Sequence, residues 1–358
     1  MCRLMLVMGL FAALLVNIVP EYAAQDVSVA TSPETSGART ANLAFSNDGR
    51  LLREIQLVNP SAASPVLSVR AITYDATTGS IRHVLNLGPD TSLFSATPDG
   101  RTAIISAGRS REDARAHLLL VDMETGQTQD IPSQWFDADD NDPYAEISAD
   151  GRIVSAYTES DPEHGLIVTL YDWQTKKFVA KQSWGYPAGG ITSGGVTADG
   201  KIEFWNNRTG GAVVDPKTGR VLVEIEPNSH RSPDGAWVVE FPNTIYGDVP
   251  KEVIIKNGRS EEVVGKLELQ IADDEQLESW SWARGAFCGT SGKFVAAANN
   301  TVQVFAMPSG KKVADFPVAA WQDADPTKTD PISIVGCSFN GKRVAIRSGT
   351  RLTLHDLN

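Results

Sequence analysis

The sequence has little positive charge for its size. Its 358 residues include 32 Lys and Arg against 44 Asp and Glu, which gives a formal net charge of −12. Proteins that bind nucleic acid need clustered Lys and Arg to neutralise phosphates, and no basic stripe occurs here. A basic amphipathic helix, which would favour an anionic membrane surface, is also missing. We therefore expect neither nucleic acid nor a membrane surface as a partner.

Cysteine is scarce as well. The three cysteines, Cys2, Cys288 and Cys337, are too few for a zinc site with four closely spaced ligands. If Cys2 is removed with a leader, the other two allow one disulfide in an oxidising compartment. A disulfide needs Cα atoms within about 7 Å, and the two cysteines fall on neighbouring repeat units whose inner strands should diverge. We therefore expect free, buried thiols.

Motifs of known catalytic sites are missing. No G-x-S-x-G sequence occurs, and segment 195–201 matches only part of a phosphate-binding loop, because Ile202 stands where Ser or Thr is required. The five histidines show no metal-binding spacing: His83, His117, His164, His230 and His355. Sequence motifs therefore indicate no enzymatic reaction.

The only long apolar run lies at the start of the chain. Residues 4–19 are apolar except for Asn17, and small residues follow up to Ala24. The run is shorter than the roughly 18 to 20 residues that cross a bilayer. We expect residues 1–24 to be a signal peptide and residues 25–358 to form one periplasmic or extracellular domain without membrane insertion.

Glycine turns, in contrast, recur at regular spacing. Asp-Gly or Asn-Gly between apolar runs is the strongest short-range signal of a β-hairpin, because the tight turn needs positive φ. Units of about 40 to 50 residues with four short strands are typical of propeller blades. The seven copies are FSNDGR (45–50), ATPDGR (96–101), ISADGR (147–152), VTADGK (196–201), RSPDGA (231–236), CGTSGK (288–293) and CSFNGK (337–342).

A second turn follows within six of the units. The runs between turns are short and rich in Val, Ile and aromatics, which favours strands over helices. We therefore expect an all-β, seven-bladed β-propeller of four-stranded antiparallel blades. The last unit ends at LHDLN (354–358) without a fourth strand, and we expect the segment 26–30 to supply it. The second turns are YDATTG (74–79), VDMETG (121–126), YDWQTK (171–176), VDPKTG (214–219), IKNG (255–258) and FAMPSG (305–310).

These turns resemble those of the WD-repeat and YVTN-type bacterial propellers over nearly all of the chain after residue 24. The resemblance also includes the pairs that end the third strand: Tyr74-Asp75, Val121-Asp122, Tyr171-Asp172, Val214-Asp215 and His355-Asp356. The Gly-His pair of strict WD repeats is missing from the units. The resemblance implies an architecture but no activity, because such folds include scaffolds, ligand-binding proteins, lactonases and redox subunits.

Antiparallel order divides the connections between two faces. Both tight turns of each unit fall on one, the turn face, and the longer connections fall on the other, the loop face, where binding residues concentrate. The six connections between units (87–91, 132–143, 183–190, 227–230, 271–283 and 317–331) hold twelve Asp or Glu and one basic residue, Lys328. The candidate binding residues are Trp135, Asp137, Asp139, Asp140, Asp142, Trp184, Asp273, Asp274, Trp280, Trp321, Asp323 and Asp325.

Aromatic anchors beside carboxylates are suited to a cationic protein or peptide. The alternative interpretation is that these carboxylates are solvated and that the Trp rings cover the cores of the units.

The loop at 137–142 also suggests calcium, because Asp137, Asp139 and Asn141 place oxygen ligands at alternate positions. Two features of an EF-hand loop are missing, since Asp142 replaces the glycine and Ser148 replaces the bidentate Glu. An acidic loop without metal is the alternative. We expect no cofactor, with calcium as the one candidate.

One unit carries a charge, Arg231, on its inner strand, where the other units are apolar. We attribute it to a local irregularity, because the interval before this turn is the shortest, at 35 residues. A charge facing the central channel or a junction between units is the alternative.

Two functions are consistent with these observations. The favoured hypothesis is an exported binding or scaffold protein that docks a protein or peptide on its loop face. The alternative is an enzyme of lactonase or hydrolase type, with polar side chains converging at the mouth of the central channel. A structural part in a larger assembly is a third possibility.

Overall fold

The computed structural model contains only strands, turns and irregular segments in the residues that it describes. No helix in this part of the chain is long and apolar enough to cross a membrane. The prediction of an all-β chain is confirmed. The described residues are 27–28, 38–59, 67–107, 117–132, 144–148, 151–159, 166–184, 193–196, 201–206, 210–215, 218, 220–225, 229–232, 234–241, 252–269, 284–298, 301–317, 334–348 and 351–357.

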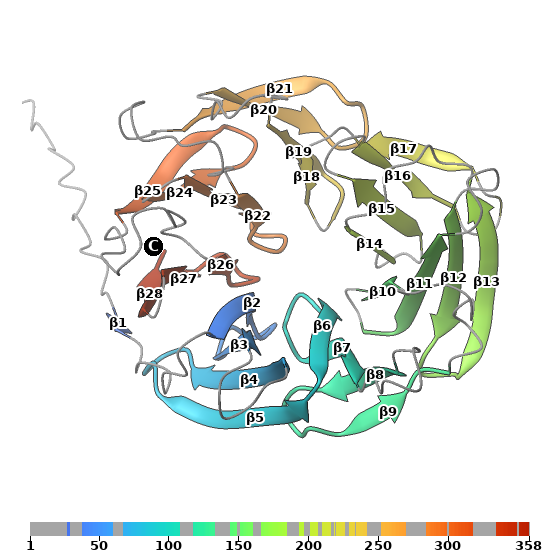
Figure 1. Cartoon of the computed structure of the whole chain (residues 1–358). Helices are drawn as coiled ribbons and strands as arrows, with labels where there is room; N and C mark the ends of the chain where they lie inside the picture. The colour runs from blue at the N-terminus through green and yellow to red at the C-terminus, as the bar shows by residue number, and fades with distance from the viewer. Residues whose placement is uncertain are drawn as a thin grey trace, which may run out of the picture.

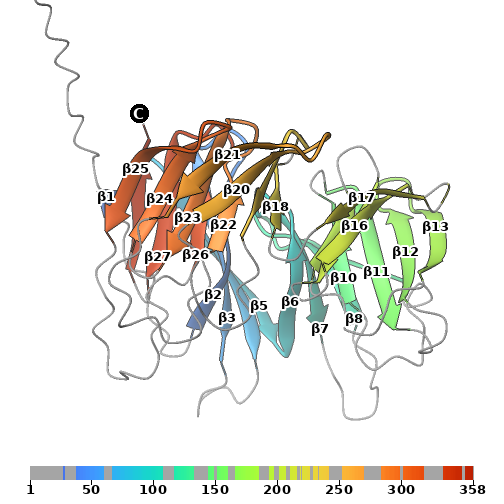
Figure 2. The same ribbon diagram turned by 90° about the horizontal axis from the view of Figure 1, so that it is seen from above.

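Seven antiparallel sheets of four strands follow one another along the chain, as predicted. Figure 1 shows them in chain order around a common centre, with the first strand of each sheet innermost. Figure 2 shows that the strands run between the same two faces of the molecule.

Six sheets take their strands in sequence order. Sheet 1 contains β2 (Ala38–Phe45), β3 (Leu51–Val58), β4 (Ser68–Asp75) and β5 (Ile81–Pro89), and sheet 2 contains β6 (Thr91–Ala96), β7 (Thr102–Ala107), β8 (His117–Asp122) and β9 (Thr128–Asp130). Sheet 3 contains β10 (Tyr144–Ile147), β11 (Ile153–Glu159), β12 (Leu166–Asp172) and β13 (Lys177–Trp184), and sheet 4 contains β14 (Ser193–Val196), β15 (Ile202–Asn206), β16 (Gly210–Val214) and β17 (Val221–Ile225). Sheet 5 contains β18 (Ser229–Arg231), β19 (Trp237–Glu240), β20 (Glu252–Asn257) and β21 (Val263–Glu268), and sheet 6 contains β22 (Arg284–Phe287), β23 (Lys293–Ala298), β24 (Thr301–Ala306) and β25 (Lys311–Pro317).

Sheet 7 is built from both ends of the chain. It contains β26 (Ile334–Cys337), β27 (Arg343–Ser348), β28 (Arg351–Asp356) and, beyond β28, the short strand β1 (Val27–Ser28). Val27 pairs with Leu354 and Ser28 with Thr353 in antiparallel register. The expectation that the segment near residues 26–30 supplies the fourth strand is confirmed.

The recurring turn is closed by one set of hydrogen bonds, seen in full at Ser46. The Ser46 hydroxyl donates to Asp48 Oδ1 at 2.6 Å and accepts from the Leu51 N–H at 3.0 Å. The Gly49 N–H donates to the Ser46 carbonyl at 2.8 Å, and Gly49 has a φ of 71°, a conformation that favours glycine. The signature is therefore the chemistry that closes the first hairpin of a sheet. Equivalent side-chain bonds recur at Thr97, Ser232 and Ser338.

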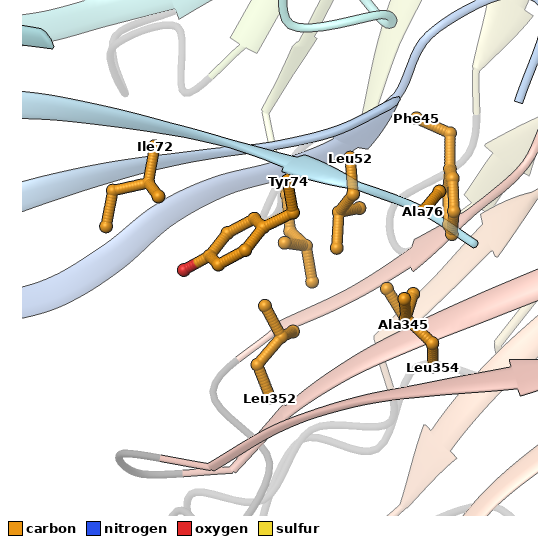
Figure 3. Close-up of a cluster of buried hydrophobic side chains, with 9 residues drawn as sticks. Phe45, Leu52, Ile72, Tyr74, Ala76, Ala345, Leu352 and Leu354 are labelled. Atoms are coloured by element: carbon orange, nitrogen blue, oxygen red, sulfur yellow. The ribbon is translucent and has the colours of Figure 1, made fainter. Parts of the chain in front are cut away.

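Neighbouring sheets bury apolar side chains between them. Buried clusters fill the junctions of sheets 1 and 2, 2 and 3, 5 and 6, and 6 and 7. Burying one Leu or Phe side chain contributes about 1.5–3 kcal/mol, so the junctions are a major source of stability. Figure 3 shows the junction of sheets 1 and 7, where Phe45, Leu52, Ile72 and Tyr74 lie opposite Ala345, Leu352 and Leu354.

The junction of sheets 1 and 7 also buries charge. Glu54 of β3 is fully buried and accepts hydrogen bonds from the Tyr74 hydroxyl at 2.8 Å and the Thr40 hydroxyl at 2.5 Å. Arg347 of β27, which is 7% exposed, places its Nε 3.4 Å from Glu54 Oε1. Because a buried charge is costly once its partner is lost, this ion pair ties the first sheet to the last.

Cys288 and Cys337 form a disulfide between sheets 6 and 7, so the expectation of free thiols is wrong. Their Cα atoms are 5.0 Å apart. Cys337 is the last residue of β26, whereas Cys288 lies one residue beyond Phe287, the end of β22. Because side chains alternate along a strand, this one-residue difference turns the two thiols toward each other. Gly289 permits the approach, since a Cβ there would lie 2.5 Å from the Phe339 carbonyl oxygen.

We expect reduction of this disulfide to lower the free energy of unfolding by about 2–4 kcal/mol, because the bond restricts the unfolded chain. Urea unfolding with and without reductant measures the change. The double variant Cys288→Ser, Cys337→Ser should show the same loss and no response to reductant. A native protein whose unfolding curve is unchanged by reductant would contradict the prediction.

We expect Glu54→Ala to lower the free energy of unfolding by about 3–5 kcal/mol, because Arg347 is then left buried without its carboxylate. Denaturant unfolding measures the loss. Glu262→Ala, at an exposed turn residue, serves as the control and should stay within about 0.5 kcal/mol of the native protein. Equal stability of the two variants would mean that the buried ion pair does not hold the sheets together.

Candidate functional site

The predicted binding residues belong to connections that start and finish at one face. Strands alternate in direction within each sheet. The connection from the last strand of one sheet to the first strand of the next therefore begins and ends opposite the tight turns. This holds after Asp130, Trp184, Glu268 and Pro317, which end β9, β13, β21 and β25. These strand ends define the loop face.

Of the candidate binding residues, Trp184 lies within the described ranges, where it ends β13 and pairs with Leu166 of β12. The calcium candidates, Asp137, Asp139 and Asn141, lie outside these ranges. Where the structure does describe the chain, it contains no group of three or more His, Cys, Asp or Glu that could hold a metal ion. The other binding candidates also lie outside the described residues: Trp135, Asp137, Asp139, Asp140, Asp142, Asp273, Asp274, Trp280, Trp321, Asp323 and Asp325.

A cavity of about 420 Å³ lies between sheets 4 and 5. One wall is strand β17, and the opposite wall is formed by sheet 5, with Arg231 on β18, Glu240 on β19 and Lys256 on β20. Residues of the turn between β20 and β21, including Gly258 and Glu261, line the cavity toward the turn face. Cavities of this size are typical of sites for small molecules.

The charged wall occupies positions that are apolar in sheets 1, 2, 3, 6 and 7, except for His355 of sheet 7. Pairing aligns Arg231 with Val238 and Val238 with Lys256 in one row across three strands. The same row in sheet 1 is Phe45, Leu52 and Tyr74, which fill the junction with sheet 7. Sheet 5 thus presents two cations where sheets 1, 2, 3, 6 and 7 carry mainly apolar side chains. The rows in sheets 2, 3, 6 and 7 are Ala96–Ala103–Val121, Ile147–Val154–Tyr171, Phe287–Phe294–Phe305 and Cys337–Val344–His355.

The two cations have different partners. The Lys256 ammonium forms an ion pair with the Glu240 carboxylate. Arg231 Nη2 donates to the Gly258 carbonyl oxygen at 2.9 Å, and its guanidinium lies against Gly235. No carboxylate in the described ranges forms an ion pair with Arg231. A guanidinium has five N–H donors, so Arg231 keeps both donors and charge for a ligand.

Arg231 therefore faces a junction between sheets, and the expected local irregularity is wrong. Strand β18 pairs regularly with β19, with His230 opposite Val239. The signal in the sequence is the charge itself, at a position that is apolar in the other units. Sequence alone does not single out Lys256, because a charged residue next to a turn is ordinary.

The neighbouring His230 points to the opposite junction, between sheets 5 and 6. Its ring centroid lies 5.5 Å from that of Phe241 and 5.9 Å from that of Phe294. Burial lowers the pKa of His230 to about 4, because the charged imidazolium loses its hydration there. This histidine is therefore part of a junction core and does not belong to the cavity wall.

We expect the protein to lose stability through His230 as the pH falls from about 6.5 to about 4. The folded protein takes up this proton only near pH 4, whereas the unfolded chain binds it near pH 6.5, so acid favours unfolding in this window. A shift of this size corresponds to on the order of 3 kcal/mol at most. Denaturant unfolding at pH 7 and pH 4.5 measures the loss.

His230→Phe should remove this part of the pH dependence, and His83→Gln, at an exposed histidine, should keep it. If both variants lose as much stability as the native protein between these pH values, another group is responsible.

Comparison with known proteins assigns no function to the loop face or to the cavity. No family model and no curated protein matches this chain. The loop face and the cavity are therefore interpreted from the position, charge and contacts of their residues.

Proposed function

We propose that this chain is an exported, seven-bladed β-propeller, similar to the WD-repeat and YVTN-type propellers, that binds a cationic protein or peptide on its loop face. Seven four-stranded sheets in succession around a common centre support the propeller architecture. Strand β1 begins at Val27, beyond the expected cleavage after Ala24, so removal of the signal peptide leaves the seventh sheet intact.

The observation that carries the proposal is the one-sided position of the connections. The strand directions place the ends of every connection between successive sheets on the face opposite the tight turns. These connections hold twelve acidic residues and a single Lys. Carboxylates gathered on one face of a rigid scaffold attract a cationic partner and orient its approach.

Tryptophan supplies the apolar contact area that a binding surface needs in addition to charge. Hot spots of protein interfaces are enriched in Trp, which contributes a large apolar contact area when it is desolvated. Trp135 stands beside the acidic segment 137–142, and Trp321 precedes Asp323. In this proposal the carboxylates speed the encounter, and the indole rings supply most of the affinity.

The test is affinity capture from an extract of the envelope of the source cells. The native protein should retain a partner. The variant Asp139→Asn, Asp140→Asn should retain that partner at least about tenfold less, because two negative charges are removed from the acidic segment 137–142. Capture should also weaken as salt is raised, since the attraction is screened.

The matched control is Glu261→Gln, Glu262→Gln, which removes the same charge from exposed residues of the turn between β20 and β21, on the opposite face. It should capture the partner as the native protein does. Equal losses in both double variants would show only an effect of net charge, and equal retention by all three proteins would remove the acidic loops from the proposal.

A further inference from the structure

In the part of the chain that the structure describes, the cavity between sheets 4 and 5 contains one cation, Arg231, without a carboxylate partner. Arg231 and Lys256 lie in one row two strands apart, so their Cα atoms are separated by about 10 Å. Glu240 balances Lys256, whereas Arg231 is bonded to the backbone carbonyl of Gly258. The three charged side chains on strands β18, β19 and β20 therefore sum to +1, and Glu224 and Glu261 bring the whole lining to −1.

The remaining acidic side chains of the lining differ from Glu240 in their surroundings. Glu224 and Glu261 are exposed, so water screens their carboxylates. Their repulsion of a negative group is therefore weak. Arg231 is the strongest site for such a group, because it is half-buried on the innermost strand of sheet 5.

The other wall of the cavity, strand β17, is apolar except for Glu224. Val223 and Ile225 of β17 line it, and Val238 lies between the two cations on the sheet 5 side. Farther along the same strand, Val221 and Leu222 are 43% and 40% exposed. An apolar body placed against β17 would remove this surface from water, which favours binding by roughly 25 cal/mol per Å².

We propose that this cavity binds a small organic carboxylate with an apolar body, with the carboxylate on Arg231 and the body against β17. A guanidinium presents paired N–H donors that match the two oxygens of a carboxylate. A phosphate dianion would bring more negative charge toward Glu240 and Glu261, and an ammonium group would meet Arg231 with the same sign. Among the described residues Arg231 has no carboxylate partner, and a monoanion supplies one negative charge with the least repulsion toward Glu224, Glu240 and Glu261.

This site is separate from the proposed partner surface. The turn between β20 and β21, which contributes Gly258 and Glu261 to the cavity, lies on the turn face, opposite the connections between sheets. Loss of partner capture and loss of carboxylate binding are therefore independent outcomes.

The experiment uses three probes that share one body: 4-phenylbutyrate, 4-phenylbutanol and 4-phenylbutylammonium. Isothermal titration calorimetry on the whole protein should give at least about tenfold tighter binding for the carboxylate than for the alcohol, as expected for a charge-assisted hydrogen bond. The ammonium probe should bind no better than the alcohol. Absence of carboxylate binding, or equal affinity for carboxylate and ammonium, would overturn the proposal.

Two variants locate the site. Arg231→Met keeps an apolar stem of similar length and should weaken 4-phenylbutyrate binding at least about tenfold, whereas Arg220→Met, at an exposed Arg next to β17 that does not line the cavity, should bind as the native protein does. Equal losses in both, or none in Arg231→Met, would place binding elsewhere.

A measurement on the native protein keeps the test independent of how the variants fold. Methyl resonances of Val223, Ile225 and Val238 should shift on addition of 4-phenylbutyrate, because these side chains line the cavity. Methyl groups of the junction between sheets 1 and 7, such as those of Leu352, should stay unchanged. Shifts confined to other regions would overturn the assignment.

Discussion

Each four-stranded sheet of this molecule packs its two faces against the adjacent sheets. The row of side chains across its first three strands decides how closely one face packs against its neighbour. In sheet 1 the row is Phe45, Leu52 and Tyr74, and it packs against sheet 7 (Figure 3). In sheet 5 the same row contains Arg231 and Lys256, and these two side chains line a cavity. Charged side chains in this row thus distinguish the junction of sheets 4 and 5, where the cavity lies, from the apolar junction of sheets 1 and 7.

Features that depend on local chemistry could be predicted from the sequence. The Ser/Thr-x-Asp-Gly turns are closed by their own side chains, as at Ser46, so each copy marks a hairpin wherever it lies. Counting these turns was enough to predict the number of sheets, and the unfinished last unit pointed to the strand at Val27 and Ser28.

Features that depend on which way a side chain faces could not be predicted in the same way. Cys288 and Cys337 meet because their strands end one residue apart in the repeat, a shift that is invisible when the turns are aligned by their glycines. Arg231 and Lys256 share a wall because of pairing across β18, β19 and β20. Lys256 is separated from Arg231 by 25 residues, so no spacing rule connects them. Apart from Trp184, which ends β13, the acidic and Trp residues predicted for the loop face belong to segments of the sequence between the strands, where strand periodicity gives no guidance.

The pairing of β1 with β28 has a consequence for how the chain is assembled during synthesis. Val27 is made 327 residues before its partner Leu354, so sheet 7 cannot form until the chain has been synthesised as far as β28. Until then the face of sheet 1 that carries Leu52 and Tyr74 has no cover. A chain that crosses a membrane unfolded would have both β1 and β28 available before folding starts, and it would avoid this interval of exposed apolar surface.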